Sequence, residues 1–438
     1  MNLFATVVMP ALLIAQAPRE TPAAAHAGKV FVKAAHLIDG RNDTVRDGVG
    51  VLIENGRFVE ILSAAPAGAK VIDLGNAWLL PGLIDAHTHV LLQGDITAAE
   101  YDEQLLKESI PYRAIRATAA ARIAVMNGFT TIRDVETEGA MYADVDMKKA
   151  IDRGIIPGPR MFVSTRAMAP TGMYPLLGYA WDIQVPEGVQ IVDGVEGVRK
   201  AVREEAKYGA DWIKFYADRK YYQTGDPKRP LRSWVNFTPA EMEAMVTEAH
   251  RIGKKVAAHA MGWDGIDAAL TAHVDSIEHG DGFTDDLLDR AAKQPTYWCP
   301  TLYVGVWVAP GRGGNWPEMV EMSRRAIGSG VKRGVKIAFG TDAGGFPWTE
   351  NEAKEFALMV RGGMTPMQAI KAATSVAGAL LDPICPPQSN ACTGSEVGSI
   401  EKGKHADLVA VDADPLKDVT VLEHVSFVMK DGEVLKSR

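Results

Sequence analysis

The sequence has few cysteines, no long apolar run and no excess of positive charge. Only 3 of its 438 residues are cysteine, which excludes a scaffold built on disulfides. No apolar run reaches the roughly 18 residues that a membrane-spanning helix needs. Lysine and arginine total 47 against 55 acidic residues, and this net charge of −8 argues against nucleic acid as the main partner. With 47% hydrophobic and 23% charged residues, the composition predicts a globular chain with a substantial core.

The first residues look like a targeting segment. Residues 3–15 form an apolar run that is too short to span a bilayer, and Ala15-Gln16-Ala17 fits the small-residue rule for signal-peptide cleavage. No lysine or arginine precedes the run, and an N-terminal extension is the alternative. We expect a signal peptide over residues 1–17 and a linker rich in proline and alanine over 18–28. A cleaved signal places the protein in the periplasm or outside the cell, whereas an uncleaved one leaves it in the cytoplasm.

The cysteines fit either compartment. Cys299 stands in an aromatic stretch and is expected to be a small buried hydrophobic residue. Cys385 and Cys392 flank a turn-rich segment and could form a disulfide if the chain is exported. A metal site there is disfavoured because no histidine lies nearby. The segment 385–395 suggests no function of its own.

The two ends of the chain share a pattern of short strands. In residues 29–80, apolar segments are broken by glycine and asparagine, and Asn55-Gly56 is typical of a tight hairpin turn. Residues 386–438 have the same texture, with a turn at Asp431-Gly432. We therefore expect one small β domain that is built from both ends.

The middle of the chain, residues 81–385, alternates strands and helices. Residues 238–241 read as a capping box with proline at the first helical position, and the amphipathic run that follows should end at Gly253. Residues 365–368 form a second capping box. Repeated strand–helix alternation predicts a parallel sheet, which periodicity alone leaves either open or closed into a barrel.

The strongest chemical signal is a pair of histidines in the segment 79–90. His87 and His89 stand two residues apart at the end of an apolar strand, so both side chains project to the same face. Two adjacent imidazoles can bind one cation. The alternatives are two core histidines with satisfied hydrogen bonds, or a chance pair on a loop. With only 10 histidines in the chain, the pattern favours a metal.

Lys214 lies inside an apolar strand, on the same face as Trp212 and Tyr216. A buried lysine is costly unless it is paired or chemically changed. One interpretation is a lysine that reaches solvent or pairs with Asp211 or Asp218. The other is an active-site lysine that acts as a Schiff base, a general base or a metal-bridging carbamate. The residues alone leave both interpretations open.

Three further residues follow apolar strands. His259 and His279 end two successive strands, and α/β barrels have their active sites at the carboxyl ends of the strands. The alternative is a structural role, which is the more common one for a single histidine. Asp342 follows a strand and a Gly-Thr turn; it either caps a turn or binds metal and moves a proton. We assign the other histidines to the surface, the core or the terminal regions: His26, His36, His250, His273, His405 and His424.

Taken together, the strand ends carry His-x-His, Lys, His, His and Asp in that order. This set resembles the amidohydrolase superfamily, in the binuclear branch with a carbamylated lysine. The similarity is greatest to the imidazolonepropionase-like group, which includes Xaa-Pro dipeptidases, Lys/Arg carboxypeptidases and ochratoxin-hydrolysing amidohydrolases. It covers nearly the whole chain after residue 28, through the segments 36–61, 76–89, 340–345, 364–381 and 398–415.

The resemblance implies an α/β fold, a (β/α)8 TIM barrel over residues 81–385, with a small β-sandwich formed by 29–80 and 386–438. It also implies two divalent metal ions, zinc by the nitrogen and oxygen ligands, and a homo-oligomer. A hydroxide that bridges the metals would attack an amide carbonyl, and Asp342 would pass a proton to the leaving amine. The implied ligands are His87, His89 and Asp342 for one metal, His259 and His279 for the other, and Lys214, as a carbamate, between the two.

Differences between this sequence and its relatives help to predict the substrate class. Residues 164–175 lack the Gly-Gly-His run of some relatives, which disfavours activity on an imidazolone ring. Tyr216, Tyr222 and Arg229 are candidates for binding a substrate carboxylate, unless their segment is a solvated loop. We expect a dipeptide or an N-acyl amino acid with a free carboxylate, including ochratoxin-type amides. The alternatives are a cyclic amide or lactone hydrolase, a deaminase, which Lys214 disfavours, and a metal-free scaffold.

Overall fold

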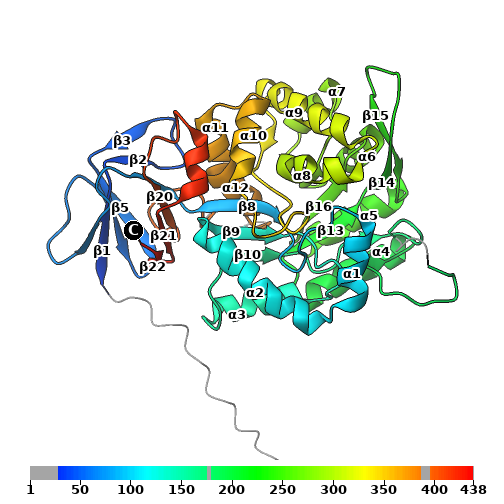
Figure 1. Cartoon of the computed structure of the whole chain (residues 1–438), viewed down its shortest axis with the longest axis horizontal. Coiled ribbons are helices and arrows are strands. Elements are labelled where there is room, and N and C mark those ends of the chain that lie inside the picture. Colours follow the sequence, from blue (N-terminus) through cyan, green and yellow to red (C-terminus); the bar gives the residue numbers. More distant parts are fainter. Residues whose placement is uncertain (1–27, 175–178, 386–394, 438) are drawn as a thin grey trace, which may run out of the picture.

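The computed structural model describes residues 28–174, 179–385 and 395–437, which form a β-rich end and a larger α/β body (Figure 1). The predicted signal peptide of residues 1–17 lies outside the described residues, as does all but the last residue of the linker. Cys392 also lies outside them, so its disulfide with Cys385 stays a prediction. None of the described helices combines the length and apolarity that are needed to cross a bilayer.

Two sheets form the β-rich end. One has the strand order β5-β4-β1-β6, and the other has the order β22-β21-β20-β7-β2-β3. In the second sheet, β20 pairs antiparallel with β7, so the two ends of the chain contribute to one sheet. The bounds are β1 Lys29–Lys33, β2 His36–Ile38, β3 Val45–Asp47, β4 Gly50–Glu54, β5 Arg57–Leu62, β6 Lys70–Asp73, β7 Trp78–Pro81, β20 Leu408–Val411, β21 Phe427–Lys430 and β22 Glu433–Lys436.

The turns and the packing explain this arrangement. The predicted hairpin turns are confirmed: Asn55 and Gly56 have φ of 50° and 72°, and Asp431 and Gly432 have φ of 51° and 79°. Apolar side chains of both sheets meet in one buried cluster. Its members include Val32, Leu37, Val51, Phe58, Leu79, Leu408 and Phe427.

Parallel strands form the centre of the body. They make a sheet with the order β10-β9-β8 and a second sheet with the order β12-β11-β13-β16-β17-β18-β19. An antiparallel hairpin, β14 Asp218–Gln223 and β15 Leu231–Val235, projects at one side. The parallel strands are β8 Leu83–Thr88, β9 Phe129–Asp134, β10 Arg160–Val163, β11 Met168–Ala169, β12 Gln190–Ile191, β13 Trp212–Tyr216, β16 Lys255–Ala260, β17 Ser276–His279, β18 Tyr297–Cys299 and β19 Lys336–Ile337.

Closure of the expected barrel is not shown, because the strands of the described residues do not pair into one continuous ring. The two interruptions fall where the backbone leaves the extended conformation. Thr165, after β10, has φ of 61°, and Asp342, after β19, has φ of 62°. Backbone hydrogen bonds nevertheless join β8 to the segment after β19, from Ala86 N to Phe339 O at 2.9 Å and from Asp342 N to His87 O at 2.8 Å.

Helices cover the strands (Figure 1). The predicted capping boxes are confirmed at the starts of α5 and α11, and α5 ends just before Gly253, whose φ is 76°. The helices are α1 Ala98–Lys107, α2 Ile110–Met126, α3 Ala143–Asp152, α4 Val195–Tyr208, α5 Pro239–Arg251, α6 Trp263–Thr271, α7 Asp285–Lys293, α8 Leu302–Arg312, α9 Trp316–Arg333, α10 Lys354–Gly362, α11 Pro366–Lys371 and α12 Ala377–Leu381, with a π-helical segment η1 Ala372–Val376 and a 3₁₀ segment η2 Val419–His424.

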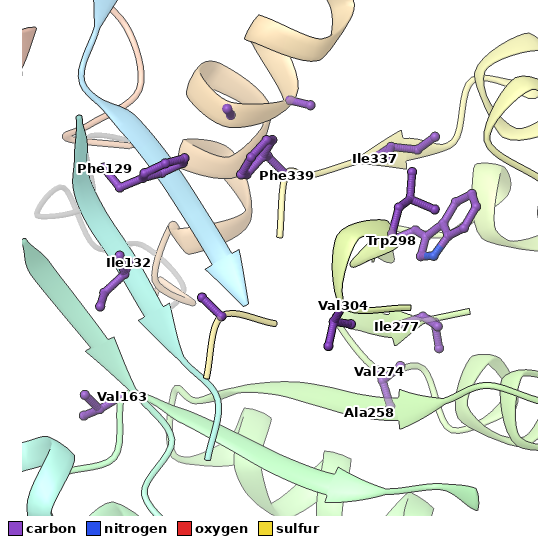
Figure 2. Close-up of a cluster of buried hydrophobic side chains, with 14 of the residues drawn as sticks. Phe129, Ile132, Val163, Ala258, Val274, Ile277, Trp298, Val304, Ile337 and Phe339 are labelled. Carbon is purple, nitrogen blue, oxygen red and sulfur yellow. The ribbon is translucent and has the colours of Figure 1, made fainter. Parts of the chain in front are cut away.

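The main core lies between the strands and these helices. Side chains from several strands, including Phe129 of β9, Ile277 of β17 and Trp298 of β18, are completely buried there (Figure 2). Cys299 is free and buried, as predicted. Because the strands run parallel, their carboxyl ends lie at one edge, and the polar side chains that follow them are brought together.

Candidate functional site

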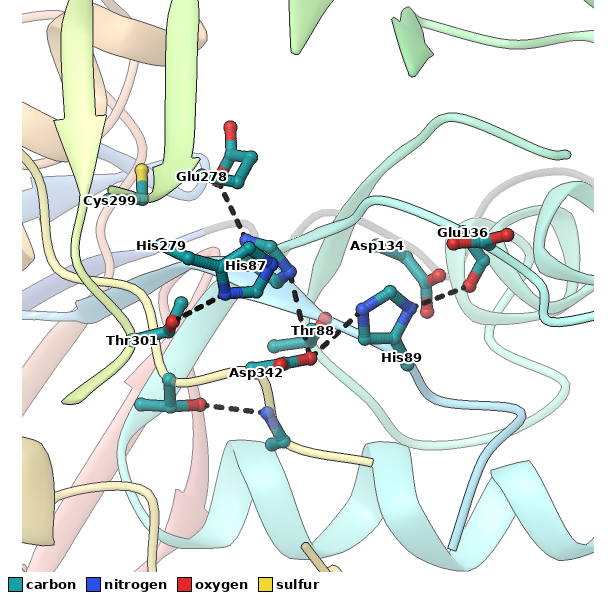
Figure 3. A network of polar contacts seen from close by, with 12 residues as sticks. His87, Thr88, His89, Asp134, Glu136, Glu278, His279, Cys299, Thr301 and Asp342 are labelled. Carbon is teal, nitrogen blue, oxygen red and sulfur yellow. Dashed lines mark hydrogen bonds and ion pairs between the residues drawn. The ribbon is translucent and has the colours of Figure 1, made fainter. Parts of the chain in front are cut away.

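His87 and His89 lie at the carboxyl end of β8, and both are buried. Nδ1 of His87 lies 2.7 Å from Oε2 of Glu278, and Nδ1 of His89 lies 3.1 Å from the backbone oxygen of Glu136. Their Nε2 atoms lie 3.6 Å and 3.0 Å from Oδ1 of Asp342 (Figure 3). Nε2 of His87 has no hydrogen-bond partner among the described residues, although it is buried. His87 is therefore not a core histidine with satisfied hydrogen bonds.

His259 and His279 come from the neighbouring strands β16 and β17, and their ring centroids lie 4.5 Å apart. Nδ1 of His279 lies 2.8 Å from the hydroxyl of Thr301, and Nε2 of His259 lies 2.5 Å from the hydroxyl of Tyr221. The ring of His279 is in turn 5.0 Å from the ring of His87. The four imidazoles thus form one continuous group.

All four histidines share a pattern that suits metal binding. A protein group engages one ring nitrogen of each, and in His87 and His89 the other nitrogen faces Asp342. Ligating histidines usually have one nitrogen held in this way, because it fixes the tautomer and the ring orientation. Ligand atoms of His87, His279 and Asp342 all lie within 4.8 Å of one another. The residues present therefore fit a metal, and the orphaned Nε2 of His87 is the atom that most needs one.

The backbone at the site is strained. Asp342, His279 and Thr301 have φ of 62°, 71° and 47°, in the left-handed region that non-glycine residues rarely adopt. Such conformations cost about 1–3 kcal/mol each and cluster at functional sites. They direct the side chains of Asp342 and His279 to the same point, and Thr301 supports His279.

Lys214 lies in β13 and is 1% exposed. No hydrogen bond or ion pair joins its Nζ to another described residue, so the pairing considered with Asp211 or Asp218 is not found. Asp211 instead pairs with Lys148 at 2.6 Å, and Asp218 accepts from the backbone of Gly262 at 2.8 Å. Burial lowers the pKa of Lys214, which favours the neutral amine.

Burial also sets the charge of the histidines. It lowers the pKa of His87 to about 3 and that of His279 to about 4, and it holds the pKa of His259 well below its usual value. These imidazoles are therefore neutral at pH 7, as metal ligands must be. At His89, the effect of burial is outweighed by Asp342, whose hydrogen bond and charge raise the pKa to about 10.

The site opens into a cavity of about 350 Å³, which we call the inner cavity. It is lined by all six residues predicted as metal ligands and by Tyr216, one of the candidates for substrate contact. Tyr222 and Arg229 do not line it, so the structure does not bring them together with the other predicted site residues. Tyr222 packs on Trp234 on the outer side of the hairpin, and Arg229 stacks on Trp263. Side chains of a strand alternate between its faces, and Tyr221 is the neighbour that faces inward.

Sequence reasoning missed several buried residues around the histidines. Glu278 is held by Arg133 through a 2.8 Å ion pair. Burial alone would raise the pKa of Glu278, but the charge of Arg133 and the bond to His87 hold it well below its usual value. Glu136 and Glu138 form a second group of ligand atoms with His89. The sequence positions of these glutamates could have identified them as neighbours of the site. Glu278 directly precedes His279, and Glu136 and Glu138 follow strand β9.

His250 and His273, which the sequence predicts at the surface or in the core, do not line the inner cavity and do not belong to the groups of possible metal ligands. His250 pairs with Asp275 at 2.8 Å on the helical side of the sheet.

Comparison with known proteins shows which family and which chains this sequence is similar to. The model of the Amidohydrolase family matches residues 78–435. The chain is 30% identical to ochratoxinase of Aspergillus niger, over 82% of this chain and 75% of that protein. It is 23% identical to imidazolonepropionase of Thermoplasma acidophilum, over 94% of each chain. The crystal structure of a Xaa-Pro dipeptidase with bound methionine in the active site matches with a TM-score of 0.79 and 33% identity, over 93% of this chain and 100% of that one.

Proposed function

Since the chain belongs to the amidohydrolase family and is a hydrolase of amide C–N bonds, we propose that it cleaves small amides with a free carboxylate. Dipeptides and N-acyl amino acids, including ochratoxin-type amides, are the substrates of this class. The observation that carries the proposal is the convergence of four histidines, Lys214 and Asp342 on one cavity of about 350 Å³. The relatives support it, because their names include an ochratoxinase and a Xaa-Pro dipeptidase. Their fold supports a TIM-barrel-type body.

We assign two divalent metal ions to this cavity, with zinc as the ion that best suits nitrogen and oxygen ligands and a hydrolytic task. Lys214 would bind both as a carbamate, because a free ammonium cannot ligate a cation. The neutral amine that burial favours is the form that adds CO2. The remaining ligands would be His87, His89 and Asp342 for one ion, and His259 and His279 for the other.

Bound metals would supply a water of lowered pKa as the nucleophile and would polarise the scissile carbonyl. Asp342 would move the proton. Its Oδ1 lies 3.0 Å from Nε2 of His89, and the hydrogen bond and nearby imidazoles hold its pKa below the usual value in spite of burial. It is therefore ionised at neutral pH and can accept a proton at Oδ1 and return it to the leaving nitrogen.

The test is the release of free amino acids from a panel of dipeptides and N-acyl amino acids. The full chain is loaded with zinc in the presence of bicarbonate and assayed with and without a chelator. We expect release that the chelator abolishes and zinc restores. Release that is indifferent to chelation would contradict the metal centre. No release from the panel by protein that retains its metals would reject this substrate class in favour of ring amides, lactones or deamination.

A further inference from the structure

One arginine of the inner cavity, Arg219, makes no hydrogen bond or ion pair with the residues that the structure describes. Arg219 is the second residue of β14, and its side chain is exposed to the cavity. No hydrogen bond or ion pair joins its guanidinium to any residue in the described ranges. By contrast, Arg312, which also lines the cavity, donates to the backbone oxygen of Asp95 at 2.7 Å and lies 3.3 Å from its carboxylate. Arg219 is thus a cation whose donors are available to a ligand.

Aromatic rings hold Arg219 in place. Its guanidinium carbon lies 4.0 Å from the ring centroid of Tyr174 and 5.1 Å from that of Tyr216. Both tyrosines are themselves fixed, since Tyr174 donates to Glu138 at 2.8 Å and Tyr216 donates to Glu136 at 2.6 Å. The acidic residues therefore bind the tyrosine hydroxyls and leave the arginine unpaired. A guanidinium stacked in this way presents its N–H edge without further loss of side-chain freedom.

Arg219 also stands at the right place for a substrate. A second cavity, of about 580 Å³, shares Arg219, Tyr174 and Trp316 with the inner cavity, and we call it the outer cavity. On the inner side, the ring of Tyr216 is close to both Arg219 and His259, with 4.6 Å between the centroids of Tyr216 and His259. A group bound at Arg219 is therefore one aromatic ring away from the proposed metal ligands.

We propose that Arg219 binds the free carboxylate of the substrate through a bidentate ion pair, and so sets the preference for acids over neutral amides. The inference rests on the proposed function. Arginine is suited to this role because its planar fork matches the two oxygens of a carboxylate. The carboxylate could belong to the leaving amino acid or to the acyl group, and the choice of substrates separates these sources.

The test compares Arg219→Met with the wild type on three substrates. These are N-acetyl-L-phenylalanine, its C-terminal amide, and the amide of N-succinyl-L-phenylalanine, whose only carboxylate lies on the acyl side. We expect kcat/KM for the preferred acid to fall about 10- to 100-fold, mainly through KM, while the substrate without a carboxylate is unaffected. A loss on the first acid alone assigns the leaving side, and a loss on the succinyl compound alone assigns the acyl side.

Arg229→Met is the matched control. Arg229 also stacks on an aromatic ring, with its guanidinium carbon 4.0 Å from the centroid of Trp263, but it lines neither the inner nor the outer cavity. Its variant should keep the kinetics of the wild type. An equal loss on all three substrates in Arg219→Met, or no loss on either acid, would overturn the proposal.

Calorimetry separates this proposal from the assigned reaction. Binding of N-acetyl-L-phenylalanine and of its amide to the zinc-loaded protein is measured without reference to turnover. If the wild type hydrolyses neither compound but binds the acid more tightly than Arg219→Met does, the reaction is wrong and the carboxylate site stands. The same comparison is made with the amide of N-succinyl-L-phenylalanine. If the wild type and Arg219→Met bind each of the two acids equally, the carboxylate site is wrong, whatever the reaction.

Discussion

Oε2 of Glu278 lies 2.7 Å from Nδ1 of His87, and both side chains are completely buried. Arg133 donates a hydrogen bond to the other carboxylate oxygen of Glu278 at 2.8 Å. The ionised glutamate therefore fixes the orientation of the His87 ring through Nδ1. Nε2 of His87, on the opposite side of the ring, is the atom that lacks a partner among the described residues. The proposed metal ligand is thus oriented by a residue that never reaches the cavity.

Glu278→Gln should weaken zinc binding about 10- to 100-fold, because a neutral amide orients and polarises His87 less well than a carboxylate. Competition with a chromophoric chelator measures the affinity. Glu205→Gln is the control, because Glu205 is equally buried but binds Thr165 and Arg166, away from the histidines. Equal affinity in both variants would show that Glu278 has only a structural role.

Lys214→Met should remove the carbamate and lower the metal content below that of the wild type. Carbon-13 NMR of protein prepared with labelled bicarbonate detects the carbamate, and elemental analysis gives the metals bound. Lys255→Met is the control, since Lys255 lies on the neighbouring strand with its Nζ bound to the backbone oxygen of Leu380 at 2.7 Å. A labelled carbamate that survives in Lys214→Met would assign it to another lysine.

Asp342→Asn should keep metal bound and lower kcat by about 10²- to 10⁴-fold, because the amide cannot accept the proton that the carboxylate moves. Steady-state kinetics and metal analysis of the same preparation check both parts. A rate near that of the wild type would exclude the proton-transfer role of Asp342.

Glu401→Gln should destabilise the β-rich end at neutral pH. Glu401 binds Arg41, which lies far away in the sequence, and also Lys404 and Ser399. Burial opposes ionisation of Glu401, but these contacts outweigh it and lower its pKa to about 2. Since the folded pKa is depressed, the stabilisation is fully present above the unfolded pKa of about 4.3 and is lost as the pH falls toward 2.

Chemical denaturation of Glu401→Gln between pH 7 and pH 3 measures this effect. The deficit in unfolding free energy should be about 1 kcal/mol at pH 7, allowing for partial exposure, and should shrink below pH 4. Glu433→Gln, at an exposed position of β22, is the control. A deficit that does not change with pH would mean that the side chain acts through packing rather than charge.

The site histidines could be predicted because their position depends on strand ends alone. His87 and His89 end an apolar strand, and parallel strands bring such ends together. The capping box before α5 and the hairpin turns were likewise predictable, since short local patterns determine them. That Lys214 is buried and has no hydrogen-bond or ion-pair partner among the described residues depends on distant elements, so it required the structure.

The substrate contacts could not be predicted in the same way. Alternation in a hairpin shows that Tyr221 and Tyr222 face opposite sides, but not which side is the cavity. Moreover, the register of β14 against β15 shifts between Asp218 and Lys220. Strict alternation fails at such an irregularity, so the sequence does not tell to which face of the hairpin Arg219 points. The interruptions of the parallel sheet at Thr165 and Asp342 come from left-handed backbone, which propensities do not assign to threonine or aspartate at given positions.

We propose that six residues at the strand ends hold two metal ions. Anomalous diffraction at the zinc edge, from crystals of the zinc-loaded protein, tests it most directly. We expect two peaks, one beside His87, His89 and Asp342 and one beside His259 and His279, with density for a carbamate on Lys214 between them. Absence of peaks at these residues in fully loaded protein, or zinc bound elsewhere, would contradict it.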